Sequence, residues 1–296
     1  MITPRRCFAA VMALVVATVF LAACGDDGPE TDVSASPTTP APETPAAPPS
    51  EDAPPAGGET VELEVWFVQD GDLFLGRREV PETPAVGRAA LETLLQGPSD
   101  LESEVEVQTV IPAGTELLDL TVADGVATVD LSGEYASGGG SASMFARLAQ
   151  VVYTLTQFGT VDGVLFELDG ERVETFSSEG IGLDGPQMRR DYRDQVPAIV
   201  VEEPRVGEEV TSPLTVSGNA NTFEATVEMR LVGPSGKELA HTFTTATCGT
   251  GCRGDYSVEV EFDVSRPTDA VLEVYESSAE DGSPTHVERI PITLMP

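Results

Sequence analysis

The chain of 296 residues has little of the chemistry on which many enzymes and nucleic-acid-binding proteins depend. It contains one lysine, Lys237, one tryptophan, Trp66, and two histidines, His241 and His286. Lysine and arginine together number 16, against 50 aspartate and glutamate residues, which gives a formal net charge of −34. Because a surface of this sign repels phosphates, the composition argues against a nucleic-acid partner. A soluble, strongly acidic surface is the simplest interpretation.

Short motifs of several common catalytic sites are also missing. The sequence contains no GxSxG nucleophile elbow, no HExxH zinc pair and no phosphate-binding P-loop. The four cysteines are Cys7, Cys24, Cys248 and Cys252. None of them lies in a pattern typical of a cytosolic redox centre, and no cofactor is expected.

The N-terminus has the pattern of an export signal. A short basic region at 1–6 precedes an apolar run at 8–21, which is too short for an ordinary membrane span. The sequence Leu-Ala-Ala-Cys-Gly at 21–25 resembles the lipobox of bacterial lipoproteins. This resemblance implies removal of residues 1–23 and attachment of lipid to Cys24. The alternative is an ordinary signal peptide followed by a chance cysteine.

Residues 24–59 are predicted to form a disordered tether. From 25 to 59 the segment holds nine prolines, many alanines and threonines, and no aromatic residue. Such a composition buries too little apolar surface to offset the entropy of ordering. Proline-rich chain extends by about 3.1 Å per residue, so the tether would reach on the order of 100 Å.

Residues 60–176 have the pattern of an α+β domain. Strands are predicted at 61–68, 73–78, 118–122, 126–131 and 161–168, with a helix ending at Gly97 and a second after the glycines at 138–140. Residues 99–115 have few signals and are predicted as a long loop. In the second helix, Met144, Leu148, Val151, Val152, Leu155 and Phe158 form the apolar face, and Arg147, Gln150, Thr154 and Gln157 the polar face. We expect a mixed sheet covered by two helices.

This domain resembles the GerMN family, which is linked to sporulation and spore germination. The likeness is carried by VATVDLSGEYASGGG, LAQVVYTLTQF and VDGVLFELDGE. Strand, glycine loop, helix and strand agree with the family in order. The resemblance implies the GerMN fold and a connection with sporulation or germination.

Residues 177–197 are predicted to be a linker with a short helix, and 198–296 an all-β immunoglobulin-like sandwich of about seven strands. Val227, Met229 and Leu231 alternate with polar residues, as in a half-buried strand. The segments VTSPLTVSGNANTFEATVEMRL, FTTATCGTGCRGDYSVEVEF and VLEVYESSAEDGSPTHVERIPITL resemble the immunoglobulin-like domain of bacterial spore germination proteins.

The glycine loop of the first domain is a candidate ligand-binding site. It comprises Gly138, Gly139, Gly140, Ser141 and Ser143, with the acidic Glu134 close by in sequence. Free N–H groups at a helix start attract anions, and Ser141 or Ser143 is expected to cap the helix. The alternative is a flexible loop that ends in an ordinary helix cap, and the acidic surroundings favour it.

Acidic residues of the same domain offer a second hypothesis, a glycan hydrolase. A pair of carboxylates drawn from Asp130, Glu134, Asp162, Glu167 and Asp169 would supply acid and base if the two lay a few ångströms apart. The alternative is that they are solvated charges at strand ends and turns. Calcium binding by the acidic turns is not favoured, because the alternating ligands of an EF-hand loop are absent, and no metal site is predicted.

Two further features concern charge and sulfur. Arg189, Arg190 and Arg193 form the basic cluster of the linker, for which salt bridging is favoured over docking of an acidic partner. Cys248 and Cys252 are predicted to form a disulfide, since an exported chain lies in an oxidising environment. A redox pair is the less favoured alternative.

Together these features predict an exported protein, lipid-anchored to the outer face of the cytoplasmic membrane. We expect a non-catalytic binding or scaffolding role in the cell envelope, with a cell-wall glycan or an envelope protein as partner. The rival function is a peptidoglycan hydrolase that uses paired carboxylates. A small-solute receptor is disfavoured, because its two lobes would normally be alike.

Overall fold

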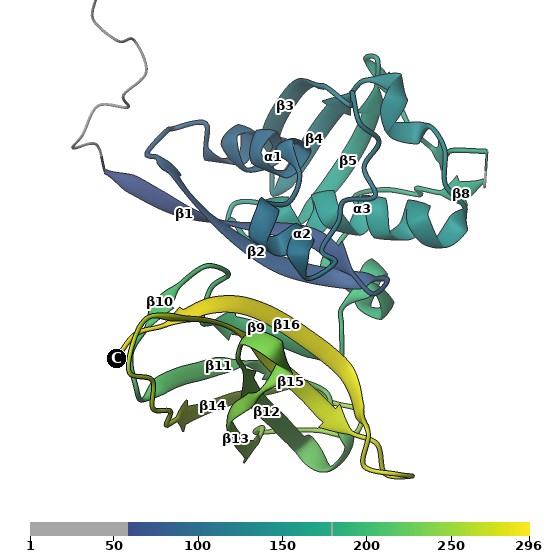
Figure 1. The fold of residues 1–296 in the computed structure, drawn as a ribbon. Helices are drawn as coiled ribbons and strands as arrows, with labels where there is room; N and C mark the ends of the chain where they lie inside the picture. The colour runs from purple at the N-terminus through teal and green to yellow at the C-terminus, as the bar shows by residue number, and fades with distance from the viewer. Residues whose placement is uncertain (1–58, 179) are drawn as a thin grey trace, which may run out of the picture. The chain divides into compact units, whose positions relative to one another are not determined.

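The computed structural model describes residues 59–178 and 180–296, all of which belong to one compact unit (Figure 1). The predicted signal peptide, the lipid site at Cys24 and the tether up to residue 58 lie outside the described residues. Within the described part of the chain, no helix is both long enough and apolar enough to cross a membrane.

The first half of the described chain is an α+β domain, as predicted. Its main elements are β1 (Thr60–Gln69), β2 (Asp72–Pro81), α1 (Val86–Gln96), α2 (Asp100–Glu104), β3 (Leu117–Ala123), β4 (Val126–Leu131), α3 (Ser141–Leu155), β5 (Gly163–Leu168) and β6 (Glu171–Arg172). A four-stranded sheet has the order β3-β4-β5-β6, in which β4 and β5 are parallel. Because parallel neighbours require a crossover connection, α3 lies between them in sequence.

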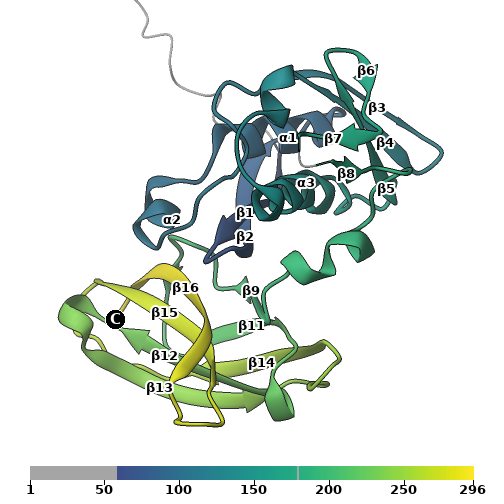
Figure 2. The same ribbon diagram turned by 90° about the vertical axis from the view of Figure 1, so that its right-hand side faces the viewer.

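Strands β1 and β2 do not join that sheet, which differs from the single mixed sheet expected. They form an antiparallel hairpin of their own, closed at Asp70 and Gly71, both with positive φ. Helix α3 contacts β1, β2, β5 and α1, so its surroundings are protein on several sides (Figures 1 and 2). Most of its residues are therefore buried, including Arg147, Gln150 and Thr154, which the helical pattern placed on an outer polar face.

The polar side of α3 is buried because it completes the hydrogen bonding of β1. Strand β1 pairs with β2 along one edge only. On its other edge, Thr154 accepts a hydrogen bond from the Trp66 N–H at 3.1 Å, and Gln150 donates one to the Trp66 carbonyl at 2.9 Å. Gln157 bonds both backbone groups of Glu64. The helix side chains thus act as the missing neighbour of an edge strand.

Residues 99–115, predicted as loop, contain the short helix α2. Ser99 accepts a hydrogen bond from the Glu102 N–H at 3.3 Å, and the Glu102 carboxylate accepts one from the Ser99 N–H at 2.7 Å. This capping box explains why so short a helix forms. The Glu102 side chain is fully buried and is paired with Arg78 of β2, which anchors α2 to the hairpin.

The remaining short elements lie in the first domain and the linker. They are η1 (Gly133–Ala136) between β4 and α3, and β7 (Thr175–Phe176), β8 (Ile181–Gly182) and the 3-10 helix η2 (Arg189–Gln195) after β6. The helix predicted in the linker therefore exists as η2, and its Tyr192 is buried.

The second domain is a β-sandwich with eight strands rather than about seven. Its elements are β9 (Ile199–Glu203), β10 (Glu209–Val210), β11 (Leu214–Ala220), η3 (Phe223–Ala225), β12 (Thr226–Val232), η4 (Pro234–Gly236), β13 (Glu238–Thr245), β14 (Gly254–Val260), β15 (Thr268–Ser277) and β16 (Pro284–Leu294). One sheet has the order β10-β16-β15-β12-β13 and the other β14-β11-β9. Val227, Met229 and Leu231 of β12 are fully buried, as their alternation predicted.

Candidate functional site

The glycine loop lies on the surface between η1 and α3. Gly138 and Gly139 have positive φ, which glycine adopts without strain. The residue that caps α3 is Gly140, and no side chain provides a capping hydrogen bond. The expectation that Ser141 or Ser143 caps the helix is therefore wrong, because the helix begins at Ser141 and includes both serines.

A buried arginine beneath the loop holds it in place. Arg147 of α3 is 2% exposed and donates to the carbonyls of Val110 at 2.9 Å, Ser137 at 2.9 Å and Gly138 at 3.3 Å, and also to that of Tyr135. Burial lowers the pKa of Arg147. Sequence reasoning missed this contact, since a lone arginine on a helical polar face normally points to water. The loop is thus held by hydrogen bonds from Arg147 to its backbone carbonyls. Ligand binding at the loop stays a prediction.

The acidic residues considered for hydrolysis serve turns at the strand ends. Asp130 accepts a hydrogen bond from the Gly170 N–H at 3.0 Å, and Asp169 accepts one from the Gly133 N–H at 3.3 Å. Glu134 is exposed. Two of the five, Asp130 and Glu167, are register neighbours on β4 and β5. Asp162 lies instead beside the turn at Gly125. A Cβ atom added to Gly125 would lie 2.7 Å from a carboxylate oxygen of Asp162.

None of these five carboxylates lines the largest cavity found in the described residues. That cavity, here called the junction cavity, has a volume of about 1050 Å³. Its walls come from the β1–β2 hairpin, α3, η2, strands β9 and β11, and the loop that carries the two cysteines. Its lining includes Trp66, Tyr153, Arg189, Arg193, Asp194 and Arg253. A cavity of this size is at the upper end of the range for small-molecule sites.

Aromatic rings and one arginine form the inner wall of the junction cavity. The rings of Trp66 and Tyr153 meet edge to face, with centroids 5.1 Å apart. The Arg189 guanidinium lies 4.8 Å from the Tyr153 centroid and 5.9 Å from that of Trp66, within cation–π range. The indole N–H of Trp66 is buried and has no hydrogen-bond partner among the described residues.

The cysteine loop positions a second arginine. Cys248 and Cys252 form the predicted disulfide. Gly251 beside it donates its N–H to Asn221 at 2.9 Å. The adjoining Arg253 donates to the Asn219 side chain at 2.7 Å and to the carbonyl of Pro197. The small loop therefore directs a guanidinium back to the linker at the edge of the cavity.

Two arginines of η2 and one beside the cysteine loop lie near enough to Tyr153 to act on the pKa of its hydroxyl. Burial raises the pKa of the Tyr153 hydroxyl, while the positive charges of Arg189, Arg253 and Arg193 act in the opposite direction. Arg189 lies 3.7 Å from a carboxylate oxygen of Glu64. Neither Arg193 nor Arg253 forms an ion pair within the part of the chain that the structure describes. The protein as a whole has a net charge of −34, so these two unpaired arginines at one cavity are an exception to its acidic surface. They are candidate binding groups for an anion.

The salt-bridging role predicted for the linker arginines therefore holds for only part of the cluster. Arg189 pairs weakly with Glu64, and Arg190 lies 3.7 Å from the neighbouring Asp191. Arg193 is exposed and unpaired among the described residues. The junction cavity also carries carboxylates, namely Glu64, Asp72, Asp194, Glu202 and Asp255, so its wall presents both signs of charge.

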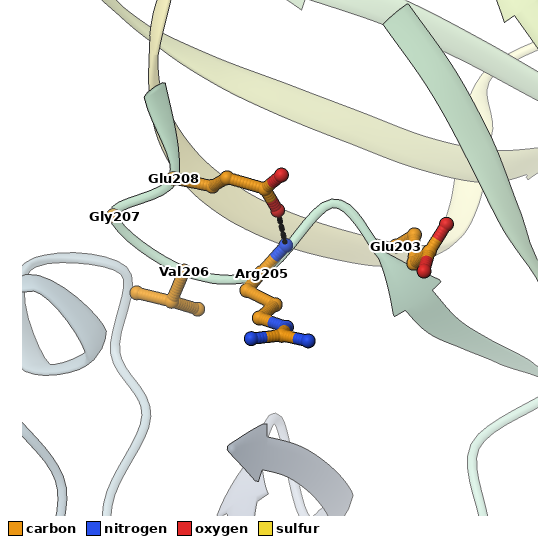
Figure 3. Close-up of a pocket in the computed structure, with 5 residues that line it drawn as sticks. All are labelled: Glu203, Arg205, Val206, Gly207 and Glu208. Carbon is orange, nitrogen blue, oxygen red and sulfur yellow. Dashed lines mark hydrogen bonds between the residues drawn. The ribbon is translucent and has the colours of Figure 1, made fainter. Parts of the chain in front are cut away.

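A smaller cavity of about 420 Å³ lies at the turn between β9 and β10 (Figure 3). Its lining residues are Glu203, Arg205, Val206, Gly207 and Glu208. Figure 3 shows the backbone N–H of Arg205 bonded to the carboxylate of Glu208, at 2.8 Å. The Arg205 guanidinium is already paired with Glu62 and Glu79 of the hairpin, so its charge is used within the protein. Among the described residues, no group of three or more His, Cys, Asp or Glu is arranged to hold a metal ion.

Comparison with known proteins identifies both domains. Residues 64–174 match the Germane family, described as sporulation and spore germination. Residues 198–283 match the Gmad2 family, described as the immunoglobulin-like domain of bacterial spore germination. Both resemblances drawn from the sequence are thereby confirmed. None of the curated proteins matches the chain.

Two solved structures of the sporulation protein GerM from Bacillus subtilis are similar to parts of the chain. Its first GerMN domain is 22% identical, covers 45% of this chain and 100% of its own, and has a TM-score of 0.37. The tandem GerMN domains are 15% identical, with a TM-score of 0.40. They cover 80% of this chain and 61% of their own.

Proposed function

Because the chain joins a Germane domain to a Gmad2 domain, we propose that it is an exported, lipid-anchored envelope protein that acts by binding. Its context would be the sporulation and germination processes by which both families are described. The lipobox at 21–25 and the proline-rich stretch after it support anchoring to the outer face of the cytoplasmic membrane. The partner is a component of the cell wall or an envelope protein.

The observation that carries a binding role is the junction cavity. Its wall carries two arginines, Arg193 and Arg253, that form no ion pair within the described residues, beside the paired rings of Trp66 and Tyr153, which are features of a recognition site. None of the carboxylates considered for hydrolysis lines this cavity, and two of them, Asp130 and Asp169, accept hydrogen bonds from backbone N–H groups at turns. This separation favours binding over glycan hydrolysis.

Fractionation of cells that express the full chain tests the anchor. We expect the protein in the membrane fraction, labelled by a radioactive fatty acid. The Cys24→Ser variant should lose the label and leave that fraction. Label that persists in Cys24→Ser would contradict the lipid site.

Incubation with purified peptidoglycan tests the mode of action. We expect saturable co-sedimentation of the protein without release of soluble fragments. Fragments released by the wild type and abolished in Asp130→Asn or Glu167→Gln would instead establish the hydrolase.

A further inference from the structure

We propose that the junction cavity binds a short zwitterionic peptide, with its carboxylate at Arg193 and Arg253 and its ammonium group at Asp194 and the neighbouring carboxylates. This inference deepens the proposed binding function and rests on it. It specifies the chemistry of the ligand, which neither the family descriptions nor the fold supplies.

Two arginines of the junction cavity are not neutralised by a neighbouring carboxylate within the described residues. Arg193 and Arg253 are exposed at the cavity and form no ion pair within the described residues. Arg253 is nevertheless held in place by Asn219 and Pro197, so its direction is set before a ligand arrives. Guanidinium groups bind carboxylates through paired, charge-assisted hydrogen bonds. A pre-positioned and unpaired guanidinium therefore fits an incoming carboxylate.

The wall that carries these arginines also carries aspartates. Asp194 adjoins Arg193 in η2, and Asp255 lies two residues after Arg253 in β14. Neither aspartate forms an ion pair within the described part of the chain. A ligand with negative charge alone would be repelled by these groups, and one with positive charge alone by the arginines. A molecule that carries both charges satisfies both.

The size of the junction cavity also fits a peptide. A volume of about 1050 Å³ far exceeds what a free amino acid fills, and it accommodates a peptide of a few residues. The Asn219 side chain donates a hydrogen bond to Glu202 and accepts one from Arg253, and the Asn221 side chain accepts one from the Gly251 N–H. These bonds fix both side chains in the wall and so shape the cavity.

Trp66 is the only tryptophan in the chain, so its fluorescence reports on the cavity directly. The folded protein would be titrated with trialanine, with N-acetyl-trialanine and with trialanine amide, and each titration repeated by calorimetry. We expect saturable binding of trialanine. Masking either end should weaken binding by about tenfold or more, the usual effect of losing a charge-assisted contact.

Two single variants assign the ends. Arg193→Gln should bind trialanine more weakly than wild type and discriminate less between trialanine and its amide, because only Arg253 remains to hold the carboxylate. Asp194→Asn should likewise discriminate less between the free and the acetylated peptide. Both side chains are exposed and form no ion pair with another described residue, so the variants are expected to fold. Arg190→Gln and Asp184→Asn, exposed residues of the same linker outside the cavity, are the matched controls and should behave as wild type.

The outcomes separate this inference from the proposed function. Absence of saturable binding up to roughly 10 mM trialanine, with peptidoglycan co-sedimentation intact, would overturn the peptide ligand and leave the binding role standing. Tighter binding of phosphocholine than of trialanine would also overturn it, in favour of a lipid headgroup. Loss of both peptide binding and co-sedimentation would overturn the two proposals together.

Discussion

Gln157, two residues beyond the end of α3, exchanges two hydrogen bonds with the backbone of Glu64 in β1, its amide nitrogen donating to the carbonyl at 2.8 Å and its amide oxygen accepting from the N–H at 2.9 Å. This is the pairing that a neighbouring strand would make. Thr154 and Gln150 of α3 continue it at Trp66, so two helical side chains and Gln157 just after the helix bond the edge of β1 that faces away from β2. The hairpin that lines the junction cavity is thereby bound to the helix.

Replacing Gln150 by leucine should destabilise the protein substantially. Gln150 is fully buried, and its loss leaves the Trp66 carbonyl and the Val110 N–H without partners. We expect the free energy of unfolding to fall by about 2–4 kcal/mol, measured by urea denaturation. The exposed Gln96 of α1 is the control, and Gln96→Leu should change stability by less than about 0.5 kcal/mol. Equal effects of the two substitutions would contradict the role of α3.

Arg147→Lys should loosen the glycine loop although charge is conserved. A lysine ammonium cannot reach the four carbonyls that the planar guanidinium joins. We expect a loss of about 2–4 kcal/mol in unfolding free energy, together with faster amide hydrogen exchange at residues 137–140. Arg172→Lys, at an exposed position of β6, should leave both measurements unchanged. A wild-type exchange rate in Arg147→Lys would show that the clamp does not order the loop.

Stability should fall as pH rises because of Glu288 in β16. Burial raises the pKa of this carboxyl from 4.5 to about 8, with Asp72 and Asp70 adding to the shift against Arg289 and Arg253. Between these values the folded state holds a proton that the unfolded state has released. The stabilisation is therefore complete below pH 4.5 and is lost progressively towards pH 8.

Glu288→Gln mimics the protonated carboxyl and should remove this dependence. At pH 8.5 we expect the variant to exceed the wild type in unfolding free energy by about 2–4 kcal/mol, with the difference shrinking towards pH 5. Glu261→Gln, at an exposed position, serves as control. If the unfolding free energies of wild type and Glu288→Gln changed with pH in the same way, the raised pKa of Glu288 would be refuted.

Removing the disulfide should affect the cavity more than the fold. Replacing Cys248 and Cys252 by serine opens a loop of few residues, for which the entropic loss is only about 2 kcal/mol. The same loop directs Arg253, however, so trialanine affinity should fall by a larger factor than stability alone explains. Thermal unfolding and the Trp66 titration measure the two effects separately. An unchanged affinity in the serine variant would separate the disulfide from the cavity.

The short-range patterns of the sequence predicted the fold class, an α+β region followed by an all-β immunoglobulin-like region, and the expected oxidising environment predicted the disulfide. Alternation of Val227, Met229 and Leu231 predicts a half-buried strand because a pleated strand turns successive side chains to opposite faces. Residue periodicity also located the second helix of the first domain. It did not reveal α2, although the Ser99 and Glu102 pair of its capping box is visible in the sequence.

What only the tertiary structure decided is where polar groups are buried and which distant residues meet. Gln150 and Arg147 have the pattern of a solvent-facing stripe, and they are buried because β1 and the glycine loop offer backbone groups to satisfy them. The junction cavity joins Trp66, Tyr153 and Arg253, which no local pattern relates. Helical and strand periods record burial by apolar contact, whereas polar burial depends on a partner that the packed chain alone brings within hydrogen-bond distance.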